Sequence, residues 1–330
     1  MKKLVCLYGT PSELVNGLNE RAAEYAAEKE LEYIWKPMQP FSEEAAVEAL
    51  RGADAGIIDV EPYDKKIFSQ INDSVKLLVR YGVGFDAVNL PDATEAGIAI
   101  SRTTVANAEA VAEMAFAMIM GAKRQFVRNR NCVNEGKWVR NIGSEMHGAT
   151  VGILGFGAIG SRLAKLFLGF DCRILVYDPY LPDEAAERAG VKKVDIDDIF
   201  RESDAVSVHV PYTKENHHIV NAERLALMKE TAVIVCTARG NLVDEEALYE
   251  ALKEERILGA GLDVFAKEPL PVTSPLIGLD NVILTPHVSA QTREALWNMY
   301  AKAIDIAAAF LNGEDIGRDL LNPEVLGKAK

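Results

Sequence analysis

Two of the five histidines follow apolar runs that resemble β-strands, and both are candidates for proton transfer. His209 stands in SVHVP and His287 stands in VILTPHV. Imidazole gains and loses a proton near neutral pH, which suits it to act as a general acid or base. Open α/β sheets build their sites at the carboxyl ends of strands, so either histidine could serve. Position alone does not decide between them.

A glycine-rich stretch, VGILGFGAIG, predicts a dinucleotide site. Its glycines follow a predicted strand, begin a predicted helix and have the G-x-G-x-x-G spacing: Gly155, Gly157 and Gly160. Glycine allows the tight turn and lets the backbone approach a pyrophosphate. The N–H groups near Ala158 and Ile159 would meet that anion at the helix N-terminus.

The next predicted strand ends in Asp178, at the distance from the glycines that the fingerprint requires. Its carboxylate would accept hydrogen bonds from the ribose hydroxyls and would repel a 2′-phosphate. No arginine stands in the adjacent PYLPDE to offset that repulsion. The sequence therefore predicts NAD, rather than NADP, as the cofactor.

Strand-like runs alternate with helical patterns both before and after this fingerprint. The alternation up to residue 101 predicts a small α/β domain, and the alternation from residue 150 predicts a second one with six or seven strands. Between them, residues 107–128 form a helical pattern that is apolar on more than one side, which predicts burial against its own domain and a partner subunit. The expected fold class is α/β, with two doubly wound parallel sheets.

Several motifs, in this order, resemble the D-isomer-specific 2-hydroxyacid dehydrogenase family: LGFGAIG with VYDPY, HVPYTKENHHIV, VIVCTARGNLVDEEAL, GAGLDVFAKEPLP and NVILTPHVSAQT. The resemblance covers the predicted dinucleotide domain almost continuously, and RYGVGFDAVNL extends it toward the N-terminus. It implies an NAD-dependent enzyme that interconverts a D-2-hydroxy acid and its 2-oxo acid, like phosphoglycerate dehydrogenases and glyoxylate–hydroxypyruvate reductases.

The family's catalytic set maps onto Arg239, Glu268 and His287. The guanidinium of Arg239 can hold the carboxylate of a 2-oxo acid and polarise its carbonyl. Glu268 would orient the imidazole of His287 and stabilise its positive charge. His287 would protonate the carbonyl oxygen during reduction and take the hydroxyl proton during oxidation. By the same resemblance, His209 is a cofactor-side or structural residue.

The resemblance also implies binding residues. Those expected to touch NAD beyond the fingerprint are Val210, Pro211, Asn216, Thr237, Ala238, Arg239, Asp263 and His287. Among them, Asp263 resembles the acceptor for the nicotinamide carboxamide. Val83 and Gly84 resemble a loop whose backbone N–H groups hold the substrate carboxylate together with Arg239, although an ordinary strand-to-helix turn is the alternative.

In this family the NAD domain is inserted into the substrate domain. The resemblance therefore implies a Rossmann NAD domain over residues 102–289, inserted into a flavodoxin-like substrate domain made of residues 1–101 and 290–330. The stretch from Arg128 to Met146, which contains Trp138, resembles the family's arm around a second subunit. A homodimer is expected.

Composition excludes other classes of function. The 330 residues carry a net charge of −13, which speaks against binding to nucleic acid. The apolar stretch around Glu113 is too short to span a membrane. The four cysteines are widely separated, without a C-x-x-C pair. This pattern suits reduced thiols in a cytoplasm, and no metal site is expected.

Two alternatives remain open at this point. Formate and phosphite dehydrogenases resemble the same scaffold, but formate enzymes carry glutamine where Glu268 stands. A redox-sensing corepressor that binds NAD is the other. The substrate's side chain is not determined by the sequence; specificity is expected to depend on Val60, Glu61, the loop 81–85 and the SAQT that follows His287.

Overall fold

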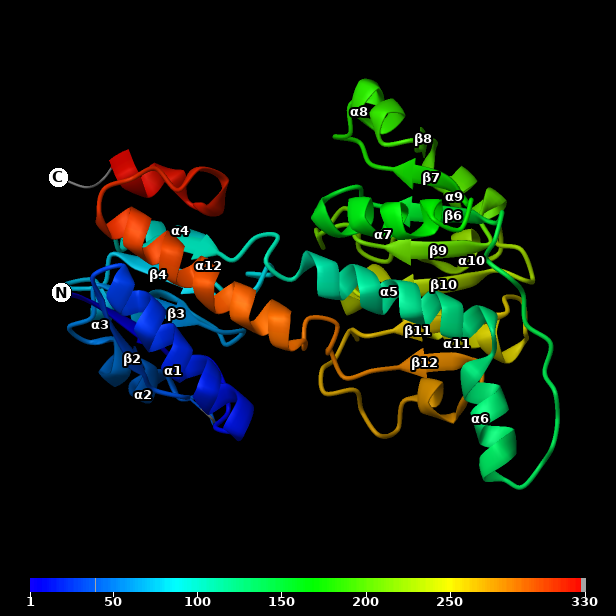
Figure 1. The fold of residues 1–330 in the computed structure, drawn as a ribbon, viewed down its shortest axis with the longest axis horizontal. Coiled ribbons are helices and arrows are strands. Elements are labelled where there is room, and N and C mark those ends of the chain that lie inside the picture. The colour runs from blue at the N-terminus through cyan, green and yellow to red at the C-terminus, as the bar shows by residue number, and fades with distance from the viewer. Residues whose placement is uncertain (39, 328–330) are drawn as a thin grey trace. The chain divides into compact units, whose positions relative to one another are not determined.

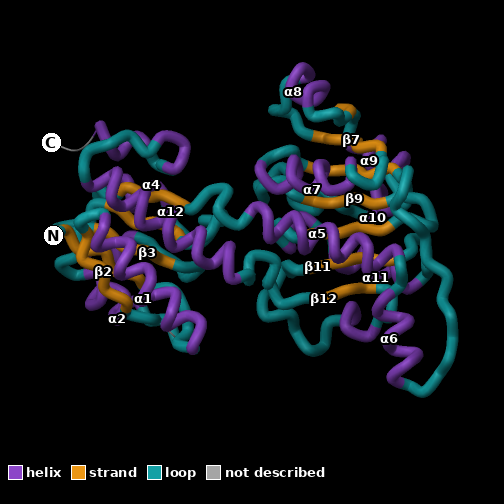
Figure 2. The backbone as a smooth tube through the Cα atoms, in the orientation of Figure 1, coloured by secondary structure: helices purple, strands orange, loops and turns teal. Residues whose placement is uncertain are grey.

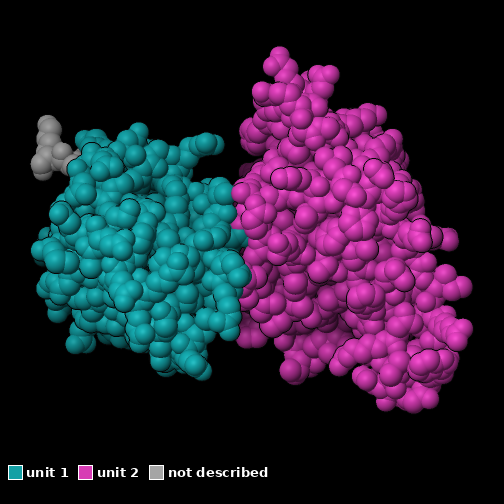
Figure 3. Space-filling view, in the orientation of Figure 1, with its two compact units in different colours: residues 1–107, 293–330 teal, residues 108–292 magenta. Residues whose placement is uncertain are grey.

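The computed structural model describes residues 1–38 and 40–327. The chain divides into two compact units, Met1–Asn107 with Arg293–Lys330 and Ala108–Thr292, which Figure 3 colours separately. The second unit is thus an insertion within the first. The chain passes from the first unit to the second after residue 107 and returns after residue 292, a few residues beyond the expected domain boundaries. At each of these points a helix begins.

The described residues of the first unit form a five-stranded parallel sheet in the order β2-β1-β3-β4-β5. This 2-1-3-4-5 order is flavodoxin-like, as expected. The strands are β1 (Lys2–Cys6), β2 (Leu31–Trp35), β3 (Ala55–Ile58), β4 (Leu77–Arg80) and β5 (Ala99–Arg102). The helices are α1 (Glu13–Glu28), α2 (Glu43–Leu50), α3 (Lys65–Ile71), α4 (Leu90–Glu95) and α12 (Arg293–Leu311), labelled in Figure 1.

Side-chain caps and apolar burial explain these helices. Ser12 accepts a hydrogen bond from the Val15 N–H at the start of α1, which satisfies one of the free N–H groups there. The last helix, α12, returns to this unit and packs against α1 and β4. Its Tyr300 and Ile304 are fully buried, so α12 completes the core of the first unit.

The second unit, all of whose residues are described, has a seven-stranded parallel sheet in the order β12-β11-β10-β9-β6-β7-β8. This is the Rossmann order, which confirms the predicted α/β class. The strands are β6 (Thr150–Leu154), β7 (Arg173–Tyr177), β8 (Lys192–Lys193), β9 (Ala205–Val208), β10 (Val233–Cys236), β11 (Gly259–Leu262) and β12 (Val282–Leu284). The strand order reverses between β6 and β9, where such sheets form a ligand crevice.

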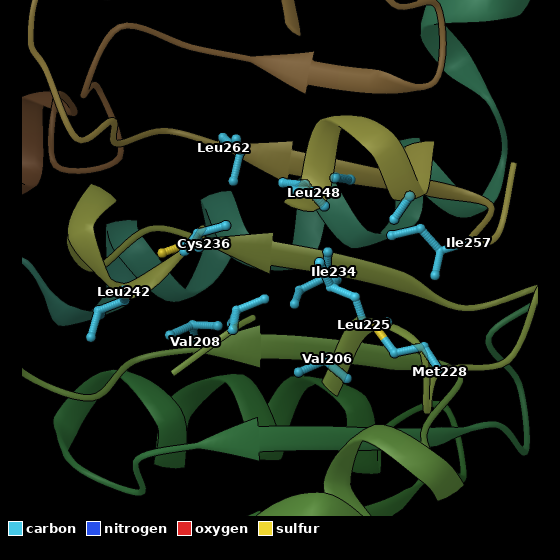
Figure 4. Packing of buried hydrophobic residues seen from close by; sticks show 14 of the residues in the cluster. Val206, Val208, Leu225, Met228, Ile234, Cys236, Leu242, Leu248, Ile257 and Leu262 are labelled. Atoms are coloured by element: carbon cyan, nitrogen blue, oxygen red, sulfur yellow. The ribbon is translucent and has the colours of Figure 1, made fainter. Parts of the chain in front are cut away.

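Helices cover this second sheet. They are α5 (Ala108–Lys123), α6 (Phe126–Asn134), α7 (Ala158–Leu168), α8 (Asp183–Arg188), α9 (Ile196–Glu202), α10 (Ala222–Leu225) and α11 (Glu245–Lys253). Figure 4 shows Val208, Ile234 and Cys236 of the central strands in one buried layer with Leu248 of α11. This packing fixes the strand ends that carry the candidate site.

The single helix expected over residues 107–128 is two helices, because Gln125 adopts a left-handed conformation with φ of 51° between α5 and α6. The second apolar face of α5 is also covered within the unit. The ring of Phe116 lies 4.9 Å from that of Phe167 and 5.4 Å from that of Phe170. A partner subunit is therefore not needed to bury that aromatic face.

Beyond α6 the chain continues without regular secondary structure over residues 137–146 and then enters β6, the long teal loop of Figure 2. Two large apolar side chains of this arm, Trp138 and Ile142, are 82% and 88% exposed. Among the helices of the described ranges, none has the length and apolar character needed to cross a bilayer.

Candidate active site

The glycine fingerprint forms the turn between β6 and α7, and backbone crowding explains its glycines. Gly155 has a φ of +91°, and a Cβ there would lie 2.9 Å from backbone atoms of His209 and Val210. A Cβ on Gly160 would lie 2.2 Å from the carbonyl oxygen of Gly155. A larger residue at either position would push apart β6, β9 and α7 at the point where the strand order reverses.

The N-terminus of α7 is arranged to bind an anion. Gly157 caps the helix without a side-chain hydrogen bond. The first N–H groups of a helix have no partner within the helix, so those of Ala158, Ile159 and Gly160 are left for an external acceptor. A pyrophosphate suits this position.

Asp178 follows β7 and is fixed beside the same turn. Its Oδ2 accepts a hydrogen bond of 2.8 Å from the Phe156 N–H, and its Oδ1 accepts one of 2.9 Å from the Tyr180 N–H. Carboxylate oxygens have further lone pairs. Asp178 can therefore still accept hydrogen bonds from ribose hydroxyls, in an orientation that the backbone sets.

His209 directly follows β9, and its surroundings favour the neutral imidazole. Its Nε2 is 2.8 Å from the hydroxyl of Ser207, and burial lowers the pKa of His209 to about 4. The imidazole is therefore neutral near pH 7, and no carboxylate within residues 1–38 and 40–327 is paired with it.

Two buried polar atoms near the crevice support a bound ligand. The Nδ1 of His209 and the Oγ1 of Thr237 have no hydrogen-bond partner among the described residues. Val208 pairs with Cys236, so these two residues follow neighbouring strands at the same edge. An unsatisfied buried polar group costs about 1–3 kcal/mol, and a polar cofactor lying along this edge could satisfy both. The residues at this edge therefore fit a dinucleotide such as NAD.

The remaining expected cofactor residues lie on the loops after β9 and β10. Val210 is buried, and the carbonyl of Pro211 accepts a hydrogen bond of 2.6 Å from Nδ2 of Asn216. Asn216 Oδ1 accepts another from Thr213 N–H, so this side chain folds its own loop. Ala238, which accepts a hydrogen bond of 2.7 Å from Nη1 of Arg239, is half-buried. Whether these residues touch a nucleotide stays a prediction.

The structure brings Glu268 and His287 together, although 19 positions separate them in the sequence. Oε2 of Glu268 is 2.8 Å from Nδ1 of His287, and the Phe265 N–H donates a hydrogen bond of 3.0 Å to the other carboxylate oxygen. The side chain of His287 is 48% exposed. With Nδ1 bound to the carboxylate, Nε2 is the nitrogen that can exchange a proton with a ligand.

A network centred on Asp263 holds the loop of His287, and sequence reasoning missed this role. The Asp263 carboxylate is fully buried and accepts hydrogen bonds from groups on both sides of the histidine: the Thr285 hydroxyl, the Val288 N–H, and the Ser289 N–H and hydroxyl. The His287 N–H also donates to the Asp263 carbonyl, at 2.8 Å. The polar residues around the histidine in TPHVS are the sequence signal for this network. A contact of Asp263 with the nicotinamide stays a prediction.

Arg239 follows β10, on the loop that packs against the loop of Glu268. A Cβ on Gly240 would lie 1.8 Å from the carbonyl carbon of Phe265, so the two backbones are in direct contact. Arg239 is half-buried. The three expected catalytic residues therefore lie on loops of one unit that contact or hydrogen-bond each other.

In the first unit, the loop after β4 is held from both sides. The Gly82 N–H donates to the Thr103 hydroxyl at 2.7 Å, and the Val83 carbonyl accepts a hydrogen bond of 3.1 Å from Arg102 Nη1. Burial lowers the pKa of Arg102. Over residues 1–38 and 40–327, the N–H groups of Val83 and Gly84 donate no hydrogen bond. These two amides can therefore bind an anion.

Comparisons with known proteins agree with this architecture. The family model for the D-isomer specific 2-hydroxyacid dehydrogenase NAD-binding domain matches residues 116–289. The chain is 38% identical to a glyoxylate reductase of Korarchaeum cryptofilum over 300 residues, which are 89% of this chain and 90% of that protein. It is 39% identical over 257 residues to a D-3-phosphoglycerate dehydrogenase of Methanocaldococcus jannaschii, covering 77% of this chain and 49% of that one.

A similar solved structure is D-lactate dehydrogenase with NAD+ from Lactobacillus jensenii. It superimposes with a TM-score of 0.81 at 25% identity, over 96% of this chain and 98% of that one. The chain therefore belongs to the D-isomer specific 2-hydroxyacid dehydrogenase family and is an NAD-dependent enzyme of that family.

Proposed function

We propose that the protein reduces small 2-oxo acids to D-2-hydroxy acids, with Glu268 and His287 as the acid–base pair and Arg239 as the substrate anchor. The observation that carries the proposal is the 2.8 Å contact between the Glu268 carboxylate and His287 Nδ1. Glyoxylate is the first candidate substrate, because the chain is similar over most of its length to a protein named glyoxylate reductase.

Bound NADH supplies the hydride, and the chain's own residues handle charge and the proton. The planar guanidinium of Arg239 holds the substrate carboxylate and polarises the adjacent carbonyl. The Glu268 carboxylate orients the imidazole and stabilises its protonated form. His287 donates its Nε2 proton to the carbonyl oxygen during reduction and takes it back in the reverse direction, as a general acid–base group.

Binding of NAD is assigned to the fingerprint turn and the neighbouring strand ends. Gly155, Gly157 and the first N–H groups of α7 would hold the pyrophosphate, and Asp178 would accept the ribose hydroxyls. We extend the proposal to Val83 and Gly84, whose N–H groups would donate hydrogen bonds to the substrate carboxylate.

The test is an assay of NADH and NADPH oxidation with glyoxylate, hydroxypyruvate, pyruvate and 3-phosphohydroxypyruvate, ranked by kcat/KM. We expect turnover of at least one of these 2-oxo acids with NADH, and a lower kcat/KM with NADPH. NAD reduction with formate or phosphite but with no 2-hydroxy acid would contradict the proposal. So would tight NAD binding without any turnover, which is the behaviour of a sensor.

We also propose that the enzyme is a cytoplasmic homodimer. Support for the dimer comes from an apolar surface on α6 and the following arm, made of Phe126, Val133, Trp138, Val139 and Ile142, all more than half exposed. Large exposed apolar side chains concentrated in one segment are typical of protein interfaces. Light scattering at micromolar concentration is expected to give twice the chain mass, and a monomer would contradict this.

A further inference from the structure

The motif VDEEAL begins α11, and the catalytic scheme above gives it no role. Asp244 caps the helix by accepting a hydrogen bond of 3.0 Å from the Ala247 N–H. The next residue, Glu245, is not needed for that cap. Its Oε1 instead accepts a hydrogen bond of 2.7 Å from the backbone N–H of Ala266, 21 positions later.

Ala266 lies in the loop that carries Glu268. The two successive N–H groups of this loop each bind a carboxylate: that of Phe265 donates to Glu268, and that of Ala266 donates to Glu245. The N–H group that binds the Glu268 carboxylate is thus next in the chain to the N–H group that binds Glu245. Hydrogen bonds to an ionised carboxylate are stronger than neutral ones, so this anchor is a firm one.

The same peptide unit is also fixed from another side. Gly240 packs directly on the carbonyl of Phe265 and the nitrogen of Ala266, with no room for a Cβ. The side chain of Phe265 is buried in the core. Movement of the peptide toward Gly240 is therefore blocked by backbone contact, and movement away from α11 is opposed by the hydrogen bond to Glu245.

We propose that Glu245 is a positioning residue for the Glu268–His287 pair: it fixes the 265–268 loop, and through that loop the orientation of the proton-donating imidazole. This inference rests on the proposed catalytic roles of Glu268 and His287. Glu245 itself acts only through the Ala266 N–H. A displacement of catalytic groups by about 1 Å can cost a hundredfold in rate, so a loop anchor has a measurable effect on turnover.

The structure offers a matched control for a simpler role. A carboxylate in the first turn of a helix interacts favourably with the helix dipole wherever it points. Glu246 is the next residue of the same turn and is exposed. Loss of Glu246 removes the same charge from the same helix end without touching the 265–268 loop. A comparison of variants at positions 245 and 246 therefore separates the effect of charge at the helix end from the effect of the hydrogen bond to the loop.

The experiment compares Glu245→Met, Glu245→Gln, Glu246→Met and His287→Ala with the unaltered enzyme in reduction of the best 2-oxo acid by NADH. Glu245→Met keeps the side-chain volume but has no oxygen to accept the hydrogen bond, whereas Glu245→Gln keeps an acceptor. We expect Glu245→Met to lower kcat by about tenfold with little change in the KM for NADH. Glu245→Gln should restore most of kcat, and Glu246→Met should match the unaltered enzyme.

Each result has one meaning. If Glu245→Met has the kcat of the unaltered enzyme while His287→Ala is inactive, the inference is wrong and the proposed function stands. Equal losses from Glu245→Met and Glu246→Met would also overturn it, in favour of the helix dipole. If His287→Ala retains full activity, the proposed function itself fails.

Histidine-ring NMR provides a readout that does not depend on turnover. The chain has only five histidines, and His287→Ala assigns the ring signals of that residue. We expect Glu245→Met, but not Glu246→Met, to shift the His287 ring signals, because the orientation of the ring changes. Unchanged ring signals in a folded Glu245→Met variant would contradict the inference even if kcat fell.

Discussion

Two strand ends of the same sheet carry a histidine, and the structure gives them opposite properties. His209 follows β9 at the point of strand-order reversal, where burial lowers its pKa to about 4 and its neighbour is the Ser207 hydroxyl. His287 follows β12, is half exposed and contacts a carboxylate. Burial without an opposite charge keeps an imidazole neutral, whereas a carboxylate stabilises its proton. The partner of each imidazole and its solvent exposure, rather than its place at a strand end, distinguish the proposed proton donor His287 from the neutral His209.

The largest contrast is expected from removing each histidine. His287→Ala should lower kcat for 2-oxo acid reduction by about 10²- to 10⁴-fold, because the proposed general acid is lost. His209→Ala should leave kcat much closer to that of the unaltered enzyme and mainly raise the KM for NADH. Steady-state kinetics with both variants measures this. A larger loss of kcat in His209→Ala than in His287→Ala would reverse the comparison.

The two residues should also differ in how they couple stability to pH. The pKa of His209 in the folded chain, about 4, lies below the ordinary histidine pKa of 6.5, so the unfolded chain binds more protons between these values. The stability that the neutral residue contributes is therefore complete above pH 6.5 and is lost as the pH falls toward 4, by about 3 kcal/mol. Urea unfolding of the unaltered enzyme and of His209→Asn at several pH values measures it. The same pH dependence in both proteins would contradict the prediction.

The carboxylate next to His287 can be tested without changing its shape. Glu268→Gln can still hydrogen-bond to Nδ1 but has no charge, and we expect kcat to fall by about tenfold or more, since hydrogen bonds to charged groups are the stronger ones. Steady-state kinetics with the variant is the measurement, and an unchanged kcat would show that charge at position 268 is irrelevant.

The smallest expected effect concerns Thr237, whose buried hydroxyl has no partner in the described part of the chain. Thr237→Val removes that hydroxyl while keeping the side-chain shape, so the free energy of unfolding without cofactor should rise by up to about 1 kcal/mol. NADH should bind a few-fold more weakly, because a polar contact is lost. Thermal unfolding with and without NADH measures both. Weaker NADH binding without a rise in the free energy of unfolding would contradict the prediction that the Thr237 hydroxyl is unsatisfied when no cofactor is bound.

The sequence predicts much of this fold because its patterns are local. Alternating apolar and helical runs predict both parallel sheets, and the spacing of Gly155, Gly157 and Gly160 predicts the dinucleotide turn. The contact between Glu268 and His287 could not be derived from spacing, since it joins two loops 19 positions apart. It was expected only through family resemblance.

Other features depend on packing that no local pattern contains. The left-handed Gln125 divides an otherwise continuous helical pattern, and β8 consists of only two residues. The state of His209 depends on how deeply β9 is buried. The hydrogen bonds of Asp263 depend on the polar groups that the 285–289 loop brings to it. In each case a tertiary neighbour decides the outcome.

The place of α12 in the chain has a consequence for synthesis. The first unit's core includes Tyr300 and Ile304, but these residues leave the ribosome only after the whole of residues 108–292. Multidomain chains generally fold from the N-terminus onward as they are made. Here the second unit can bury its core first. The five-stranded sheet of the first unit is made earlier, but its core is complete only after α12 has been synthesised. Nascent chains halted before residue 293 should therefore resist protease in the second unit and remain cleavable in the first.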